Sequence, residues 1–134
     1  MATDLHFHHF GVACRDLDAE AAQYAVLGYE PEEADFEDPL QGVRGRFLVG
    51  GGPRIELLAA LEGSTVLDPW LRGARRAIYH QAFEAADFDG AMARLRDARA
   101  KVVVRPVPAT AFGGRRIAFL LLQTMAMVEV IEAA

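Results

Sequence analysis

Two histidines and two glutamates, residue types that bind divalent metal ions, recur at nearly the same spacing in the two halves of the chain. His9 and His80 are 71 positions apart, and Glu56 and Glu129 are 73 apart. If two similar halves pack about a pseudo-twofold axis, two imidazole nitrogens and two carboxylate oxygens converge. Such a donor set suits one ion of Zn, Ni, Co, Mn or Fe(II) and leaves room in an octahedral shell for water or substrate. The sequence therefore predicts one divalent-ion site.

Each of these side chains also has an ordinary structural explanation. A histidine at the start of a strand is often a hydrogen-bonded core residue, and Glu56 could simply face solvent. However, Glu56 lies within the segment IELL and Glu129 within VEVI. An acid among apolar strand residues is costly unless it is paired, hydrated or bound to a cation. The apolar neighbours therefore favour the metal site.

The elements that must position these residues follow the same order in both halves. Alternating and apolar runs predict strands, and Ala-rich or amphipathic runs that follow an aspartate predict helices. The expected strands are 5–14, 29–36 (weak), 43–49, 54–59, 77–84, 102–107, 115–122 and 125–131, and the expected helices are 19–27 and 88–100. The helix N-caps are expected among Asp16, Asp18, Asp87 and Asp89, which also repeat at an offset of 71.

This recurrence predicts an α+β fold made of two βαβββ modules that form one cup-shaped mixed sheet. The whole chain, 1–134, is expected to be a single domain. Its first module spans about 5–60, a linker spans 61–76, and the second module spans about 77–134.

Composition excludes several classes of function. The 134 residues include 14 basic and 19 acidic side chains, a net charge of −5, which gives little support for nucleic-acid binding. No apolar run approaches the length of a membrane span, and no targeting segment is evident. The single cysteine, Cys14, cannot form an internal disulfide. A cytoplasmic protein that binds neither nucleic acid nor membrane is the expectation.

Several segments resemble those of a known family. The segments HFGVACRDLD from His9 and GYE from Gly28 are similar to the opening of vicinal oxygen chelate proteins, the glyoxalase, bleomycin resistance and dioxygenase superfamily. The segments HQAF from His80 and AFGGRRIAFL from Ala111 resemble those of methylmalonyl-CoA epimerases in particular. The resemblance implies the glyoxalase fold, and it implies that His9, Glu56, His80 and Glu129 bind a divalent ion.

The chain also departs from these relatives. Methylmalonyl-CoA epimerases carry a catalytic carboxylate on the third strand of the first module, where this chain has Gly45. The resemblance thus implies that one of two bases is missing, unless a loop acid such as Glu37 or Asp38 replaces it. Glyoxalase I has an arginine for glutathione where this chain has Ala13, so the glutathione-specific function has less support.

Arginines are the candidate anion contacts. A guanidinium binds a carboxylate or phosphate through two parallel hydrogen bonds. The candidates for substrate binding are Arg44, Arg46, Arg115 and Arg116.

The favoured function is a metal-dependent enzyme acting next to a carbonyl, an epimerase or isomerase of an acyl thioester with Glu129 as its catalytic base. Two alternatives stay open: a glyoxalase I-type lyase or biosynthetic enzyme with the same metal site, and a metal-free small-molecule binding or resistance protein. A homodimer is expected, because members of this superfamily commonly pair.

Overall fold

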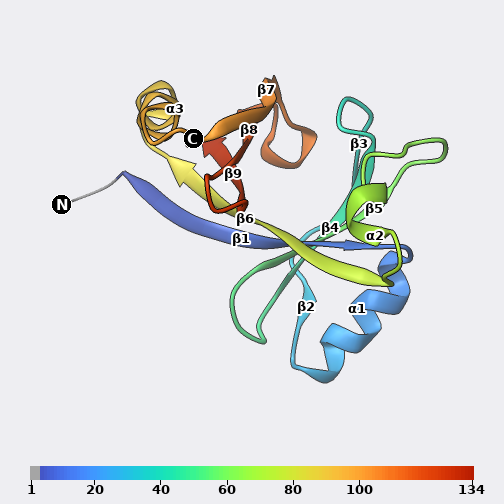
Figure 1. Ribbon diagram of the computed structural model, residues 1–134. Coiled ribbons are helices and arrows are strands. Elements are labelled where there is room, and N and C mark those ends of the chain that lie inside the picture. The colour runs from blue at the N-terminus through green and yellow to red at the C-terminus, as the bar shows by residue number, and fades with distance from the viewer. Residues whose placement is uncertain (1–3) are drawn as a thin grey trace. The chain divides into compact units, whose positions relative to one another are not determined.

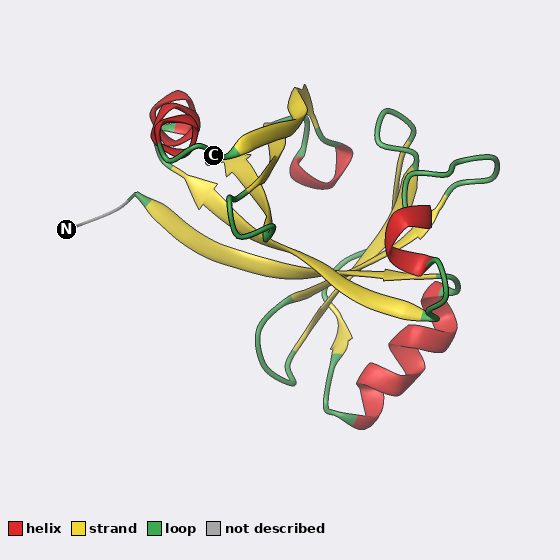
Figure 2. Cartoon of the chain, viewed as in Figure 1, coloured by secondary structure: helices red, strands yellow, loops and turns green. Residues whose placement is uncertain are grey.

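The computed structural model describes residues 4–134 and confirms the α+β fold class (Figure 1). Figure 2 shows the helices, strands and loops of the chain. In chain order the elements are β1 (Leu5–Cys14), α1 (Leu17–Val26), β2 (Glu30–Pro31), β3 (Phe36–Asp38), β4 (Val43–Val49), β5 (Ile55–Ala60), α2 (Asp68–Leu71), β6 (Arg76–Ala85), α3 (Phe88–Asp97), β7 (Lys101–Pro108), the short 3-10 helix η1 (Thr110–Phe112), β8 (Arg116–Leu121) and β9 (Met127–Glu132).

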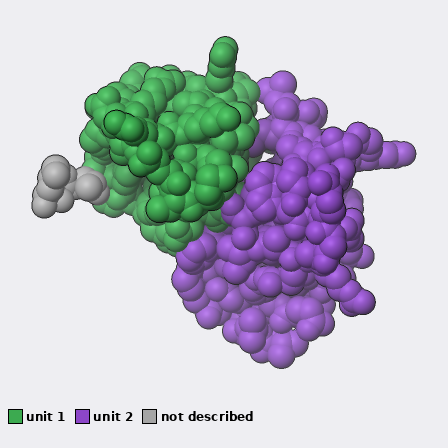
Figure 3. All heavy atoms as spheres, in the orientation of Figure 1, with its two compact units in different colours: residues 1–8, 80–134 green, residues 9–79 purple. Residues whose placement is uncertain are grey.

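The chain divides into two compact units (Figure 3). We call His9–Tyr79 the N-terminal unit, and His80–Ala134 together with residues 4–8 the C-terminal unit. In both, a strand is followed by a helix and then by further strands, as the sequence repeat predicts.

The N-terminal unit contains a mixed sheet in the order β2-β4-β5-β1, with β3 also paired to β4. β1 and β5 are parallel, and β4 is antiparallel to β5. One face of this sheet packs against α1. Val12, Leu48 and Leu57 form a buried apolar cluster there with Leu17 of the helix. We call this the helix face of the unit.

The C-terminal unit repeats this arrangement in the strand order β6-β9-β8-β7. β6 and β9 are parallel, and β8 is antiparallel to β9. Its helix face carries Leu120 and Val130, which form a buried cluster with Phe88 and Met92 of α3. Each unit thus buries one face of its sheet under a helix.

Two of the four expected capping aspartates cap helices. Asp16 accepts a hydrogen bond from the backbone N–H of Ala19 at 3.1 Å, and Asp87 accepts one from Gly90 at 3.0 Å. These are the contacts through which an N-cap satisfies the first turn of a helix. The cap prediction is wrong for Asp18 and Asp89, which lie inside the first turns and bind arginines instead.

The weak strand expected over 29–36 is broken in the structure. Only Glu30–Pro31 and Phe36–Asp38 pair with β4, as β2 and β3. Pro31 cannot donate a backbone hydrogen bond, which limits β2 to an edge position. The interruption leaves β3 as a separate short strand with its own register.

Within residues 4–134, none of the helices is both long enough and apolar enough to cross a lipid bilayer.

Cys14 is buried at the end of β1, as an inert small apolar residue would be. Burial raises the pKa of its thiol to about 11, and the nearby carboxylate of Glu20 acts in the same direction. Because the raised pKa keeps the thiol neutral up to about pH 11, almost no thiolate is present at pH 8. We expect modification by a disulfide reagent at pH 8 to be at least about 100-fold slower in the native protein than in guanidinium-unfolded protein. Equal rates would contradict this environment for Cys14.

Candidate metal centre

In the N-terminal unit, strand register brings a histidine and a glutamate together. Glu56 of β5 lies opposite Gly11 of β1, and His9 stands two residues before Gly11. Side chains two positions apart point to the same face of a strand. His9 Nε2 therefore reaches Glu56 Oε1 at 3.1 Å. Both side chains are buried, so the alternative in which Glu56 faces solvent is wrong.

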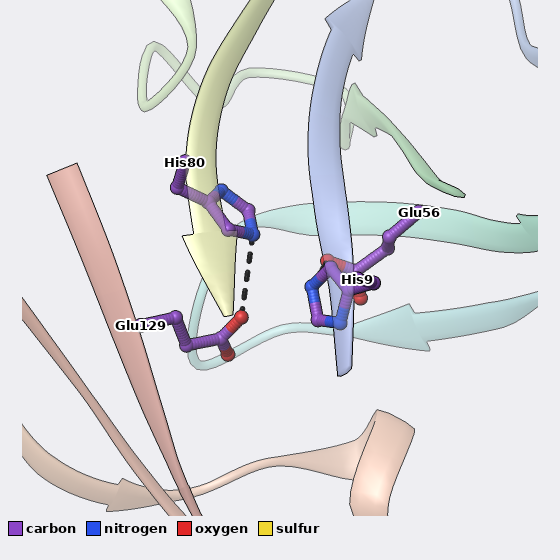
Figure 4. A group of neighbouring side chains, drawn as sticks. All are labelled: His9, Glu56, His80 and Glu129. Carbon is purple, nitrogen blue, oxygen red and sulfur yellow. Dashed lines mark ion pairs between the residues drawn. The ribbon is translucent and has the colours of Figure 1, made fainter. Parts of the chain in front are cut away.

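The C-terminal unit builds the same pair from equivalent strands. Glu129 of β9 lies opposite Ala82 of β6, and His80 stands two residues before Ala82. His80 Nε2 lies 3.3 Å from Glu129 Oε1, and both residues are buried (Figure 4). We call the face of each sheet that carries its histidine and glutamate the site face.

An aromatic ring packs against each histidine at equivalent positions. Phe47 on β4 lies opposite Glu56, and its ring meets that of His9 edge-to-face with centroids 5.4 Å apart. Phe119 on β8 lies opposite Glu129, and its ring meets His80 in the same way at 5.1 Å. Such contacts orient the imidazoles and keep water away from them. Neither ring was expected from the sequence, although Phe47 and Phe119 are 72 positions apart, an offset between those of the histidines and the glutamates.

The donor chemistry of the two pairs fits a divalent ion. Each of the four side chains offers one ligand atom, an imidazole nitrogen or a carboxylate oxygen. Burying a carboxylate is costly without a partner of suitable charge or hydrogen bonding. The same costly pair occurs in each unit, and such a repeat is not expected of one chance core histidine.

The first two candidate arginines lie on the helix face of the N-terminal unit. Arg44 and Arg46 alternate with Phe47 along β4, so they point away from the site face. Arg46 binds Asp35 through two hydrogen bonds, of 2.7 and 2.8 Å, and also binds Asp18 at 2.8 Å. Hydrogen bonding to Arg46 holds the pKa of Asp35 below its ordinary value. A substrate anion would have to displace these carboxylates.

Arg116 also lies on a helix face. Its guanidinium binds Glu132 and Asp89 and sits 4.5 Å from the ring centroid of Phe88, all on the side of α3. These contacts give Arg116 a structural role in joining α3 to β8 and β9.

Arg115 shares the site face of the C-terminal unit. It stands four positions before Phe119 and binds Glu84 at 3.1 Å, and Glu84 stands four positions after His80 on β6. Its Nε also donates to the carbonyl of Phe112 at 3.1 Å. Glu84 was not expected at the site from the sequence. Of the four candidate arginines, Arg115 is the one that faces the same side as a histidine–glutamate pair.

The space beside Gly45 is filled by an aromatic ring. Phe36 of β3 lies opposite Gly45, and a Cβ at this glycine would overlap the Phe36 ring and come within 2.9 Å of Leu58 Cδ2. The three atoms nearest to a Cβ at Gly45 belong to Phe36 and Leu58 and not to either candidate loop acid. Glu37 points to the other face, opposite Arg44. Asp38 is buried, but it accepts hydrogen bonds from the backbone and side chain of Gln41 at 3.2 and 2.8 Å.

The contact between Gly45 and Phe36 predicts a steric coupling. We expect Gly45→Ala to destabilise the protein by about 1–3 kcal/mol, because the added methyl overpacks a filled space. In a Phe36→Ala background the same change should cost about 1 kcal/mol less, because the ring that it meets is gone. Urea denaturation of the four proteins of this cycle measures both values. If Gly45→Ala lowered the free energy of unfolding equally in both backgrounds, the contact between Gly45 and Phe36 would be refuted.

Comparison with known proteins connects this arrangement to a family. The family model described as Glyoxalase/Bleomycin resistance protein/Dioxygenase superfamily matches residues 8–119. The chain belongs to this superfamily. The resemblance inferred from the sequence is therefore confirmed, and the mixed α+β sheet is the fold that it implies.

Three proteins that this chain resembles within the superfamily are epimerases. The chain is 34% identical over 115 residues to an ethylmalonyl-CoA/methylmalonyl-CoA epimerase of Cereibacter sphaeroides. This match covers 84% of this chain and 85% of that protein. The crystal structure of methylmalonyl-CoA epimerase from Mycobacterium tuberculosis matches with a TM-score of 0.84 and 26% identity, over 100% of this chain and 92% of that chain. A variant of the Streptomyces coelicolor epimerase in complex with 2-nitronate-propionyl-CoA matches with a TM-score of 0.80 and 30% identity, over 99% of each chain.

Proposed function

We propose that this protein is a divalent-metal-dependent enzyme that moves the proton on the carbon next to the carbonyl of an acyl-CoA thioester. The observation that carries the proposal is the buried histidine–glutamate pair, built twice from equivalent strands. The relatives support the substrate class, because they are methylmalonyl-CoA epimerases and one was solved with methylmalonyl-CoA.

The proposed ligands of the ion are His9, Glu56, His80 and Glu129. An ion held by them would polarise the thioester carbonyl as a Lewis acid and make the neighbouring C–H more acidic. Two nitrogen and two oxygen donors are compatible with Zn, Ni, Co, Mn or Fe(II).

The chain's own residues would orient the substrate and transfer the proton. Glu129 is the proposed base, because its carboxylate lies 3.3 Å from His80 Nε2 and is buried among apolar strand residues. A carboxylate shielded from bulk water is a more effective base than a hydrated one. Phe47 and Phe119 would exclude water from the two histidines. Arg115 is the best-placed of the candidate anion contacts.

Exchange of the α-hydrogen with solvent tests this function. Metal-loaded protein incubated with methylmalonyl-CoA in deuterated water should incorporate deuterium next to the carbonyl. A metal-bound protein with no exchange would favour the lyase or biosynthetic alternative. Absence of bound metal from the purified protein would favour the alternative of a small-molecule binding or resistance protein.

A homodimer, a cytoplasmic location and the module boundaries 5–60 and 77–134 stay predictions.

A further inference from the structure

The ring of Phe36 lies next to the His9–Glu56 pair on the site face of the N-terminal unit. Gly45 pairs with Leu58 across β4 and β5, and Glu56 stands two residues before Leu58. Gly45 and Glu56 are therefore diagonal neighbours, roughly 7–8 Å apart. Phe36 covers Gly45, and its ring centroid is 5.8 Å from that of Phe47, the ring that packs on His9.

Phe36 is held in place from both sides along the chain. Its preceding neighbour, Asp35, is bound by the Arg46 guanidinium through two hydrogen bonds. Two positions after it, buried Asp38 is tied to Gln41 through two more. Hydrogen bonds on both sides of Phe36 therefore restrain this segment, and restraint of the residues that line a site lets the site select ligands by shape.

We propose that Phe36 determines the specificity of the site by limiting the size of the substituent on the substrate carbon next to the carbonyl. The inference rests on the proposed function. A thioester carbonyl bound at the His9–Glu56 side holds its α-carbon within a few bonds of Glu56. The substituent on that carbon then reaches the space over Gly45 that Phe36 fills. Phe36 therefore admits a small alkyl group and rejects a long one.

Two alkylmalonyl-CoA substrates of different size test the proposal. Methylmalonyl-CoA and butylmalonyl-CoA are compared in metal-loaded wild type, Phe36→Ala and the matched control Phe10→Ala. Phe10 is also a half-buried phenylalanine of the N-terminal unit, but it packs on the helix face. The readouts are kcat/KM for α-hydrogen exchange and, independently of turnover, the Kd of each thioester from the fluorescence of Trp70, the single tryptophan.

Wild type should prefer methylmalonyl-CoA in both measurements. In Phe36→Ala the ratio of kcat/KM for methylmalonyl-CoA to that for butylmalonyl-CoA should fall by about tenfold or more, and the ratio of the two Kd values should change in the same sense. The reason is that one methylene more or less in an apolar pocket changes the discrimination between two substrates by about 10- to 200-fold. Phe10→Ala should leave the preference unchanged. An unaltered preference in Phe36→Ala, with wild type active, overturns the assignment of Phe36 alone. A metal-loaded wild type that neither binds nor exchanges either thioester overturns the proposed function and this inference with it.

Discussion

His80→Ala is expected to lose most of its bound divalent ion while keeping its fold. Wild type purified without an affinity tag or chelator should contain about one ion per chain by elemental analysis. Removal of one imidazole takes away one of only four proposed protein ligands, and Glu129 loses its histidine partner at 3.3 Å. The loss of a ligand weakens a metal site far more than the loss of a surrounding contact does.

The matched control is His6→Ala, which removes an exposed histidine from β1. It should retain the wild-type metal content. Circular dichroism should show that both variants are folded. In wild type, added metal at about 100 times its Kd should stabilise the native state by roughly 2.7 kcal/mol, and this gain should be much smaller in His80→Ala. Full metal retention in His80→Ala would refute the ligand assignment.

Exchange of the α-hydrogen is expected to proceed much faster than epimerisation. The resemblance to the epimerases places a second catalytic carboxylate at the position of Gly45, and here the Phe36 ring fills that space. Glu129 alone would remove and return a proton on one face of the α-carbon, which exchanges the hydrogen without inverting the centre. Because a missing general acid or base typically costs about 100- to 10,000-fold, we expect racemisation to be slower than exchange by at least about 100-fold.

The experiment starts from one epimer of methylmalonyl-CoA in deuterated water. Mass spectrometry follows deuterium incorporation, and a chiral assay of the same samples follows inversion. Glu129→Gln, with its metal content measured alongside, should reduce exchange by about 100- to 10,000-fold. Racemisation near 10 per second, a rate typical of enzymes, would show that another group replaces the second base.

The sequence was sufficient for the fold class and for the identity of both histidine–glutamate pairs. Strands and helices leave periodic apolar patterns, and an internal repeat doubles each signal, so His9 and His80 could be recognised together with Glu56 and Glu129. The family resemblance was carried by several separated segments, and the match over residues 8–119 confirms it.

Only the tertiary structure decided which arginine lies on a site face and what occupies the space at Gly45. Arg115 and Arg116 are adjacent in sequence, but side-chain alternation sends one toward Glu84 and the other toward α3. Phe36 reaches Gly45 through the register of a three-residue strand whose start depends on the break after Pro31. Register and long-range side-chain contacts leave no local pattern in the sequence, because they depend on strands that meet only when the chain has folded.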